Sequence, residues 1–184
     1  MIARLAAAAL ALVSALAVPV SASAHTTADA GPRASAPSMS VDEQLAEAYA
    51  ATSQYRYLPL ATADGYEAHL CLARPQGGMG FHYFNPSHYG SLDPKKPGGL
   101  LYEQGADGKR RLVGVEWVVP VTGKDQKRPS LFGHDFAGPM PGHYPGMPRH
   151  YDLHVWLYKK NPNGMFDQWN PDVKCPASTS SSMS

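Results

Sequence analysis

Along residues 111–119, apolar side chains recur at every second position, and this period of two predicts a β-strand with two different faces. One predicted face carries Val113, Val115, Trp117 and Val119, and the other carries Leu112, Gly114, Glu116 and Val118. Residues 151–158 alternate in the same way, and shorter segments of strand character are residues 67–73, 79–84 and 100–103. Most connections between these segments are too short for helical crossovers, so we expect a mainly antiparallel sheet.

Helices are predicted before these strands. Ser40 stands three residues ahead of Glu43, which is the spacing of a capping box, and this predicts a helix that begins near residue 41. A second, short helix is predicted over residues 58–62, because Asp64-Gly65 then supplies turn residues. The chain also holds 17 Gly and 17 Pro among 184 residues, together about 18%, whereas their usual combined share is about 12%. We therefore expect an α+β fold, with N-terminal helices packed on a curved, mainly antiparallel β-sheet and long loops rich in Pro and Gly.

The first 24 residues have the tripartite order of a secretory signal peptide. Arg4 supplies a positive charge, residues 5–18 are apolar apart from Ser14, and Ala22-Ser23-Ala24 offers small residues to a signal peptidase. The apolar stretch is shorter than the roughly 20 residues that span a membrane, so we expect a secreted or extracytoplasmic protein without a membrane span in its mature form. Residues 25–40 are expected to be a flexible spacer, residues 41–176 a single α+β domain, and residues 177–184 a disordered Ser-rich tail.

Two cysteines, Cys71 and Cys175, lie in the predicted mature domain. In an oxidising compartment an even number of cysteines normally forms disulfides, so we predict that these two are joined. A Cys/His metal site or a catalytic thiol is the alternative, although no Cys-x-x-Cys pair supports it.

The balance of charges bears on partners. Loss of Arg4 with the signal would leave 15 basic and 15 acidic residues, so the mature chain would carry no formal net charge. A neutral chain lacks the basic surface that binds nucleic acids, and we expect no nucleic-acid partner. The sequence does not identify a ligand or a protein partner.

The segment 134–154 is rich in histidine and methionine. It holds His134, Met140, His143, Met147, His150 and His154. Imidazole nitrogen binds both copper and zinc, and thioether sulfur favours Cu(I), so this segment is a candidate site for copper or zinc. The alternative is structural, because methionine often fills gaps in a core.

Strand geometry limits which of these residues can share one ion. On an extended strand, His150 and His154 would stand about 13 Å apart at about 3.3 Å per residue. That distance is too long for two bonds of about 2.1 Å to one ion. Either the chain bends after Pro148 or only one of the two histidines is a ligand.

The expected partner of His154 is His82. Each alternates with apolar neighbours on its predicted strand, and opposed residues on adjacent strands have Cβ atoms about 5 Å apart. His143 or His150 would add a ligand from the preceding loop, and Glu116 would be an oxygen ligand or a hydrogen-bond acceptor for a ligating histidine. For each residue taken alone, ordinary packing and hydrogen bonding are the alternative interpretation.

A separate copper site is conceivable at the predicted cleavage point. Cleavage after Ala24 would make His25 the mature N-terminus, where an amino group and an imidazole can chelate copper, as in the histidine-brace oxygenases. A flexible spacer follows His25 rather than a stiff strand, so we interpret this position as coincidental.

Common catalytic motifs are missing from the sequence. It has no Gly-x-Ser-x-Gly nucleophile elbow and no His-Glu-x-x-His, and Gly77-Gly78-Met79-Gly80 lacks the Lys-Ser/Thr of a phosphate loop. No catalytic residue is assigned, and three function classes stay open. They are a metal-binding domain, an extracytoplasmic hydrolase or metal-dependent oxidoreductase that uses the same pocket, and a cell-surface binding or structural module with Tyr144, Tyr151 and Trp169 exposed.

Several segments resemble a group of uncharacterised secreted bacterial proteins. They are GMGFHYFNP at residues 78–86, LVGVEWVVP at 112–120, HYDLHVWL at 150–157, NGMF at 163–166 and WNP at 169–171. The likeness covers roughly residues 43–175. It implies export and a shared fold, and it carries no catalytic residue onto this chain.

Overall fold

The computed structural model describes residues 39–176 and 180–182. The predicted signal peptide (residues 1–24), His25 and the predicted spacer up to residue 38 lie outside the described residues. Within the described residues, none of the helices combines the length and the apolar character needed to cross a membrane.

Three short helices precede the strands: α1 (Val41–Thr52), the 3-10 helix η1 (Ser53–Arg56) and α2 (Leu58–Ala63). The predicted capping box is confirmed, because Ser40 Oγ accepts the Glu43 backbone N–H at 3.2 Å and the Glu43 carboxylate accepts the Ser40 backbone N–H at 2.7 Å. These bonds satisfy backbone donors that a helix start otherwise leaves without partners. The short helix predicted over residues 58–62 is also present, as α2.

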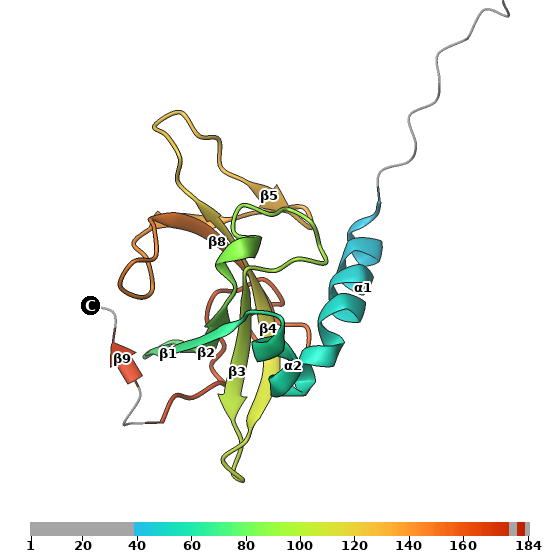
Figure 1. Cartoon of the computed structure of the whole chain (residues 1–184), viewed down its shortest axis with the longest axis vertical. Helices are drawn as coiled ribbons and strands as arrows, with labels where there is room; N and C mark the ends of the chain where they lie inside the picture. Colours follow the sequence, from blue (N-terminus) through green and yellow to red (C-terminus); the bar gives the residue numbers. More distant parts are fainter. Residues whose placement is uncertain (1–38, 177–179, 183–184) are drawn as a thin grey trace, which may run out of the picture. The chain divides into compact units, whose positions relative to one another are not determined.

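The main sheet has seven strands in the order β7-β8-β4-β3-β2-β1-β9. Their bounds are β1 (Glu67–Arg74), β2 (Gly77–Phe84), β3 (Gly99–Gln104), β4 (Arg110–Pro120), β7 (Ala137–Met140), β8 (His150–Val155) and β9 (Ser180–Ser182). Neighbours from β7 to β1 are antiparallel, and β9 runs parallel to β1. The antiparallel strands curl strongly into a half-barrel, with α1 and α2 beside β4 (Figure 1). The predicted α+β fold with a curved, mainly antiparallel sheet is confirmed.

Several short elements complete the fold. The strands β5 (Ser130–Leu131) and β6 (His134–Asp135) form a separate two-stranded sheet, and the 3-10 helix η2 (Pro86–His88) follows β2. Strand β9 falls within the tail for which the sequence predicts disorder. Residues 177–179 and 183–184 of that tail lie outside the described residues.

One face of the sheet and the helices enclose the main hydrophobic core, which we name the helix-side core. Its largest fully buried side chains are Tyr66, Tyr102, Trp117, Phe132 and Phe136. Buried polar groups in this core have partners: the Tyr102 hydroxyl donates to the Tyr55 carbonyl at 2.7 Å, and the Trp117 indole N–H donates to the Asp93 carbonyl at 3.0 Å. The helix-side core is therefore both tightly packed and satisfied in its hydrogen bonds.

The two predicted faces of β4 change over at a bulge. Leu101 of β3 pairs with Gly114, whereas the next residue, Tyr102, pairs with Leu112, so Val113 is an extra residue and the alternation shifts by one. Leu112 therefore packs in the helix-side core, and Val113 packs in a second cluster with Leu101. The predicted faces are wrong for Leu112 and Val113, because an alternating pattern does not reveal an inserted residue.

Strand β8 is shorter than the predicted strand over residues 151–158. It ends at Val155, after which the Trp156 backbone N–H donates to the Met165 carbonyl at 2.9 Å. The Tyr158 backbone N–H then donates to the Val113 carbonyl at 3.1 Å. The sequence continues to alternate past Val155, but the backbone there no longer pairs with β4 as a strand.

The predicted disulfide between Cys71 and Cys175 is confirmed. No cysteine is free in the part of the chain that the structure describes, so the alternatives of a cysteine metal ligand and a catalytic thiol are excluded. The bond ties β1 to the C-terminal segment across a sequence separation of 104 residues. Chain-entropy arguments give such a constraint on the unfolded state a stabilising effect of roughly 4–5 kcal/mol.

Candidate metal centre

Strand β8 supplies three side chains of the candidate site from one face. His150, Asp152 and His154 stand at alternate positions, and side chains on a strand alternate between its two faces. All three are buried, with at most 2% of each residue exposed. The residues between and after them pack in the helix-side core: Tyr151, Leu153 and Val155.

Glu116 on β4 is fully buried and lies directly opposite His154 on β8. On its other side, Glu116 is paired with Gly99 of β3. A Cβ atom at Gly99 would stand 3.0 Å from Glu116 Oε2 and 3.1 Å from the Phe84 ring. Because Gly99 has no side chain, the Glu116 carboxylate extends over β3 toward His82 of β2, whose Nε2 lies 3.6 Å from Glu116 Oε2.

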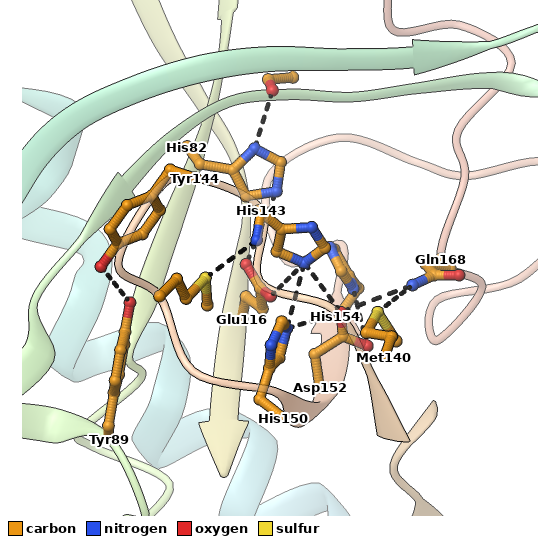
Figure 2. Close-up of polar contacts among 12 residues, drawn as sticks. His82, Tyr89, Glu116, Met140, His143, Tyr144, His150, Asp152, His154 and Gln168 are labelled. Atoms are coloured by element: carbon orange, nitrogen blue, oxygen red, sulfur yellow. Dashed lines mark hydrogen bonds and ion pairs between the residues drawn. The ribbon is translucent and has the colours of Figure 1, made fainter. Parts of the chain in front are cut away.

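His82 and His154 do not lie on neighbouring strands. Strands β2 and β8 are separated by β3 and β4, so the prediction of a cross-strand pair is wrong. The two ring centroids are nevertheless 6.2 Å apart, because both side chains lean toward Glu116 between them (Figure 2). The two predicted partners therefore lie close together, but the order of the strands brings them together and not a pairing between adjacent strands.

His143 comes from the loop between β7 and β8. Its backbone N–H donates to Met147 Sδ at 3.3 Å, which fixes the loop around the histidine. Its ring Nε2 lies 3.2 Å from His150 Nε2 and 3.4 Å from Asp152 Oδ2. His143 therefore closes the site from the side of the loop (Figure 2).

The candidate ligands described above, four histidines and two carboxylates, form two overlapping groups. The four-residue set comprises Glu116, His143, His150 and Asp152, and the three-residue set comprises His82, Glu116 and His154. Within each set the candidate ligand atoms lie within 4.8 Å of one another. Glu116 belongs to both sets, whereas His150 and His154 fall in different sets. The sequence left open a bend after Pro148 that joins both histidines at one ion or a single ligand of the two; in the structure each histidine belongs to a different set.

Backbone carbonyls orient two of the imidazole rings. Nδ1 of His82 lies 3.1 Å from the Gly80 carbonyl, and Nδ1 of His150 lies 3.1 Å from the Pro148 carbonyl. A carbonyl oxygen only accepts, so Nδ1 carries the hydrogen in these bonds and Nε2 presents a lone pair to the cluster. Histidines that bind metals usually have a partner of this kind on the second ring nitrogen.

The cluster buries polar atoms without satisfying them. Among the described residues, eight buried side-chain nitrogen or oxygen atoms have no hydrogen-bond partner. Seven of the eight belong to His82, Glu116, His143, Asp152 and His154. Each unsatisfied buried group costs about 1–3 kcal/mol, so their concentration at one place needs a physical explanation.

Burial also shifts the ionisation of the cluster. Burial and the adjacent Asp152 carboxylate raise the pKa of Glu116 well above its usual value. Burial, with smaller effects of nearby imidazoles, lowers the pKa of His82 well below its usual value, and burial lowers the pKa of His154 to about 4. For Asp152, burial alone would raise the pKa, but a hydrogen bond from His143 and the surrounding imidazoles bring it below its usual value. His82 and His154 are therefore neutral at pH 7, which is the form that binds metal ions.

Other residues of the His/Met-rich segment lie outside both sets. Met147 Sδ accepts a backbone N–H at 3.3 Å, and Met140 Sδ lies 3.8 Å from Gln168 Nε2. His134 is exposed and stacks on Phe166, with ring centroids 3.8 Å apart. Both sulfur atoms thus border the site, Met147 through the His143 backbone and Met140 through Gln168, which also contacts Asp152.

The three aromatic residues expected to be exposed differ in their surroundings. Tyr144 is half-buried and stacks on His69 with ring centroids 3.8 Å apart, and Trp169 is half-buried under the Arg74 guanidinium at 5.1 Å. Tyr151 is buried in the helix-side core. The prediction of an exposed Tyr151 is wrong, because this residue points to the opposite face of β8 from its histidine neighbours.

Asp152 is the residue that the sequence analysis missed. It lies midway between His150 and His154, so a strand at this position puts all three side chains on one face. The spacing His-x-Asp-x-His was therefore the available signal. Neither hydropathy nor a known metal motif draws attention to this aspartate.

A pocket of about 310 Å³ borders the site. Its lining residues are Arg74, Met79, Ala137, Gly138, Met140, Pro141, His143, Gln168 and Trp169. His143 brings the pocket to the four-residue set, and Gln168 Nε2 lies 3.5 Å from Asp152 Oδ2 in the same wall. The pocket thus lies beside the candidate site and contacts it through His143.

The geometry as a whole is that of a buried centre rich in nitrogen and oxygen ligands, with four imidazoles and two adjoining carboxylates. Groups of this composition can hold divalent transition metals. Comparison of the chain with protein-family models, with curated proteins and with solved structures finds no match.

Proposed function

We propose that this protein binds a divalent transition metal ion, with zinc as the first candidate, through the four-residue set. The observation that carries the proposal is the spacing of three ligand atoms. His143 Nε2, His150 Nε2 and Asp152 Oδ2 lie 3.2, 3.4 and 3.9 Å from one another. Bonds of 2.0–2.1 Å in a tetrahedral zinc site put neighbouring ligand atoms about 3.3 Å apart, so small adjustments would bring all three onto one ion.

Charge supports a cation at this place. Glu116 and Asp152 are both fully buried, and their proximity contributes to the raised pKa of Glu116. Two carboxylates repel each other strongly in a medium of low dielectric constant. A divalent cation between them would remove that repulsion and let Glu116 ionise.

The ligand types favour zinc over Cu(I). Each set offers enough imidazole and carboxylate ligands for zinc or another divalent ion without any sulfur, whereas Cu(I) prefers sulfur. The sulfur atoms of Met140 and Met147 have other contacts. Copper as Cu(II) is the alternative metal in this proposal.

The proposed metal centre would work outside the cytoplasm. The disulfide between Cys71 and Cys175 is compatible with an oxidising compartment, and the predicted signal peptide would direct export. Membership of a secreted bacterial family belongs to the same proposal, since it depends on the resemblance of the sequence segments quoted above.

The test is the metal content of the purified chain with its disulfide intact, after exposure to zinc or copper and desalting. A His25→Ala background removes any chelate at the predicted mature N-terminus. We expect at least one equivalent of zinc to be retained, and Asp152→Asn or His150→Gln to release it. His134→Gln is the matched control, because this exposed histidine lies outside both sets and should change nothing. Failure of the folded wild-type chain to retain zinc or copper would overturn the proposal.

A second candidate is an extracytoplasmic enzyme that uses metal bound in this cluster, and the pocket beside His143 is the observation that favours it. A zinc ion can activate water or polarise a carbonyl or phosphoryl oxygen. Zinc-dependent hydrolysis of p-nitrophenyl acetate or p-nitrophenyl phosphate, lost in Asp152→Asn, would support this candidate. Rates no higher than those of free zinc would leave metal binding as the function.

A further inference from the structure

We infer that the site holds two metal ions, with Glu116 bridging an ion in the four-residue set and a second ion bound by His82 and His154. This inference rests on the proposed function and adds a second ion of different character. It follows from three observations: the direction of the two Glu116 oxygens, the polar atoms that one ion would leave without partners, and the number of ligands in each set.

The two oxygens of Glu116 face different histidines. Oε1 lies 3.8 Å from His143 Nε2, and Oε2 lies 3.6 Å from His82 Nε2. Neither oxygen has a hydrogen-bond partner. A carboxylate placed between two groups of neutral nitrogen ligands can bind one ion through each oxygen. In two-metal sites the ions lie about 3.5–4 Å apart.

One ion in the four-residue set would leave the other half of the cluster unexplained. It would engage His143, His150, Asp152 and one oxygen of Glu116. His82 Nε2 and both ring nitrogens of His154 would still have no hydrogen-bond partner. These two residues are only 1% and 2% exposed, so solvent does not readily satisfy them. A second ion would bind His82 Nε2 and one ring nitrogen of His154 together with Glu116 Oε2.

His82 is already oriented for this role. Its Nδ1 donates to the Gly80 carbonyl at 3.1 Å, so its Nε2 lone pair points at Glu116. Gly80 itself has a φ of +94°, and a Cβ atom there would stand 2.6 Å from the Tyr102 carbonyl oxygen. The backbone that holds this carbonyl toward His82 is therefore available only to glycine.

The two ions would differ in their coordination. The four-residue set supplies four ligands and can complete a tetrahedral shell, as in structural zinc sites. The three-residue set supplies three, which is the number found in zinc sites that keep one position for water or substrate. The ligand class for the second ion is therefore a water molecule or a small anion that reaches a buried position.

The test is a zinc titration of the full chain in the His25→Ala background, followed by desalting and metal analysis. We expect two equivalents in the wild type and one in His82→Gln and in His154→Gln. Glu116→Gln should weaken binding of both ions at least tenfold, because it removes the bridge. His134→Gln should keep two equivalents, and circular dichroism and disulfide content establish that each variant is folded.

The outcomes separate this inference from the proposed function. One equivalent in the wild type that survives His82→Gln and His154→Gln would overturn the second ion and leave the first. Two equivalents that survive both substitutions would also overturn it, because the second ion would then lie elsewhere. No retained metal in the folded wild type would overturn both proposals.

A measurement on the wild type alone guards against variants that fail to fold. Cobalt(II) loaded in place of zinc should give a full paramagnetic resonance signal at one equivalent. At two equivalents the signal per cobalt should fall, because a bridging carboxylate couples the two ions magnetically. Two equivalents with an uncoupled signal would contradict a bridge at Glu116.

Discussion

Trp117 and Glu116 are neighbours on β4, and both are completely buried, yet they lie in opposite kinds of environment. Trp117 enters the helix-side core, where its indole N–H donates to the Asp93 carbonyl at 3.0 Å. Glu116 enters the other face of the sheet, where no donor group of the described residues reaches either of its oxygens and the Asp152 carboxylate adjoins it. The two residues are equally buried, so what sets Glu116 apart is that its polar atoms lack the hydrogen bond that Trp117 makes.

The same contrast repeats along β8. Tyr151, Leu153 and Val155 pack in the helix-side core, and the alternate residues carry the imidazoles and the carboxylate of the site. A sheet buried on both faces normally carries apolar residues on both. Here the second face concentrates buried ionisable groups, most of which have polar atoms without hydrogen-bond partners among the described residues, and the proposal of a bound cation rests on that difference.

The largest effect should come from the helix-side core. Trp117→Ala should lower the free energy of unfolding by about 3–5 kcal/mol, because it opens a cavity against Phe132 and its neighbours. If the two faces are independent, this loss should be the same with zinc and with a chelator. Denaturant unfolding in both conditions measures it, and a loss that depends strongly on zinc would break the comparison.

The stability contributed by the other face of the sheet, which carries the candidate metal centre, should depend on metal instead. Zinc at about 1,000 times its Kd should raise the free energy of unfolding by about 4 kcal/mol for one site, and a chelator should remove the gain. Asp152→Asn should lose this gain, whereas Trp117→Ala should keep it. Thermal unfolding with and without zinc gives the measurement, and equal midpoints for the wild type would count against a metal on this face.

Gly99→Ala tests whether the missing side chain at Gly99 lets the Glu116 carboxylate reach toward His82. The added methyl group would stand 3.0 Å from Glu116 Oε2, so it should push the carboxylate away from His82. We expect about tenfold weaker binding of the second zinc ion, which corresponds to about 1.4 kcal/mol, with the first ion little affected. Isothermal titration resolves the two steps, and unchanged affinity in both would show that Gly99 does not position Glu116.

The last effect, of similar size, concerns pH on the helix side. Burial and the hydrogen bond to Asp64 raise the pKa of Tyr55 to about 12 from 10. The folded state then ionises later than the unfolded state, so this tyrosine stabilises the protein fully below pH 10 and less as the pH rises through 12. Between pH 9 and 12 the wild type should lose about 1–2 kcal/mol more than Tyr55→Phe. Parallel losses in the two proteins would contradict it.

Much of the fold could be predicted because its signals are local. Ser40 and Glu43 define the start of α1, and alternation defines the centre of β4 and β8. The bulge at Val113 and the end of β8 at Val155 could not be predicted, since both depend on which strand lies alongside. The short strands β5, β6, β7 and β9 were missed because two to four residues carry too little periodicity.

The site was predictable in its residue types and not in its arrangement. Four histidines and Glu116 were identified from chemistry and spacing, and all of them belong to the two sets. Their assignment to sets depends on the order β8-β4-β3-β2 and on the space above Gly99, which no local pattern contains. Asp152 was missed because it becomes a candidate ligand only when one recognises that it shares a strand face with His150 and His154.

Anomalous diffraction at the zinc edge, from crystals of the zinc-loaded protein, tests the central claim most directly. The account predicts a peak within about 2.0–2.2 Å of His143 Nε2, His150 Nε2 and Asp152 Oδ2, on the face of the sheet opposite Trp117. A zinc-bearing crystal whose peaks all lie at surface residues, with none inside the cluster, would contradict it.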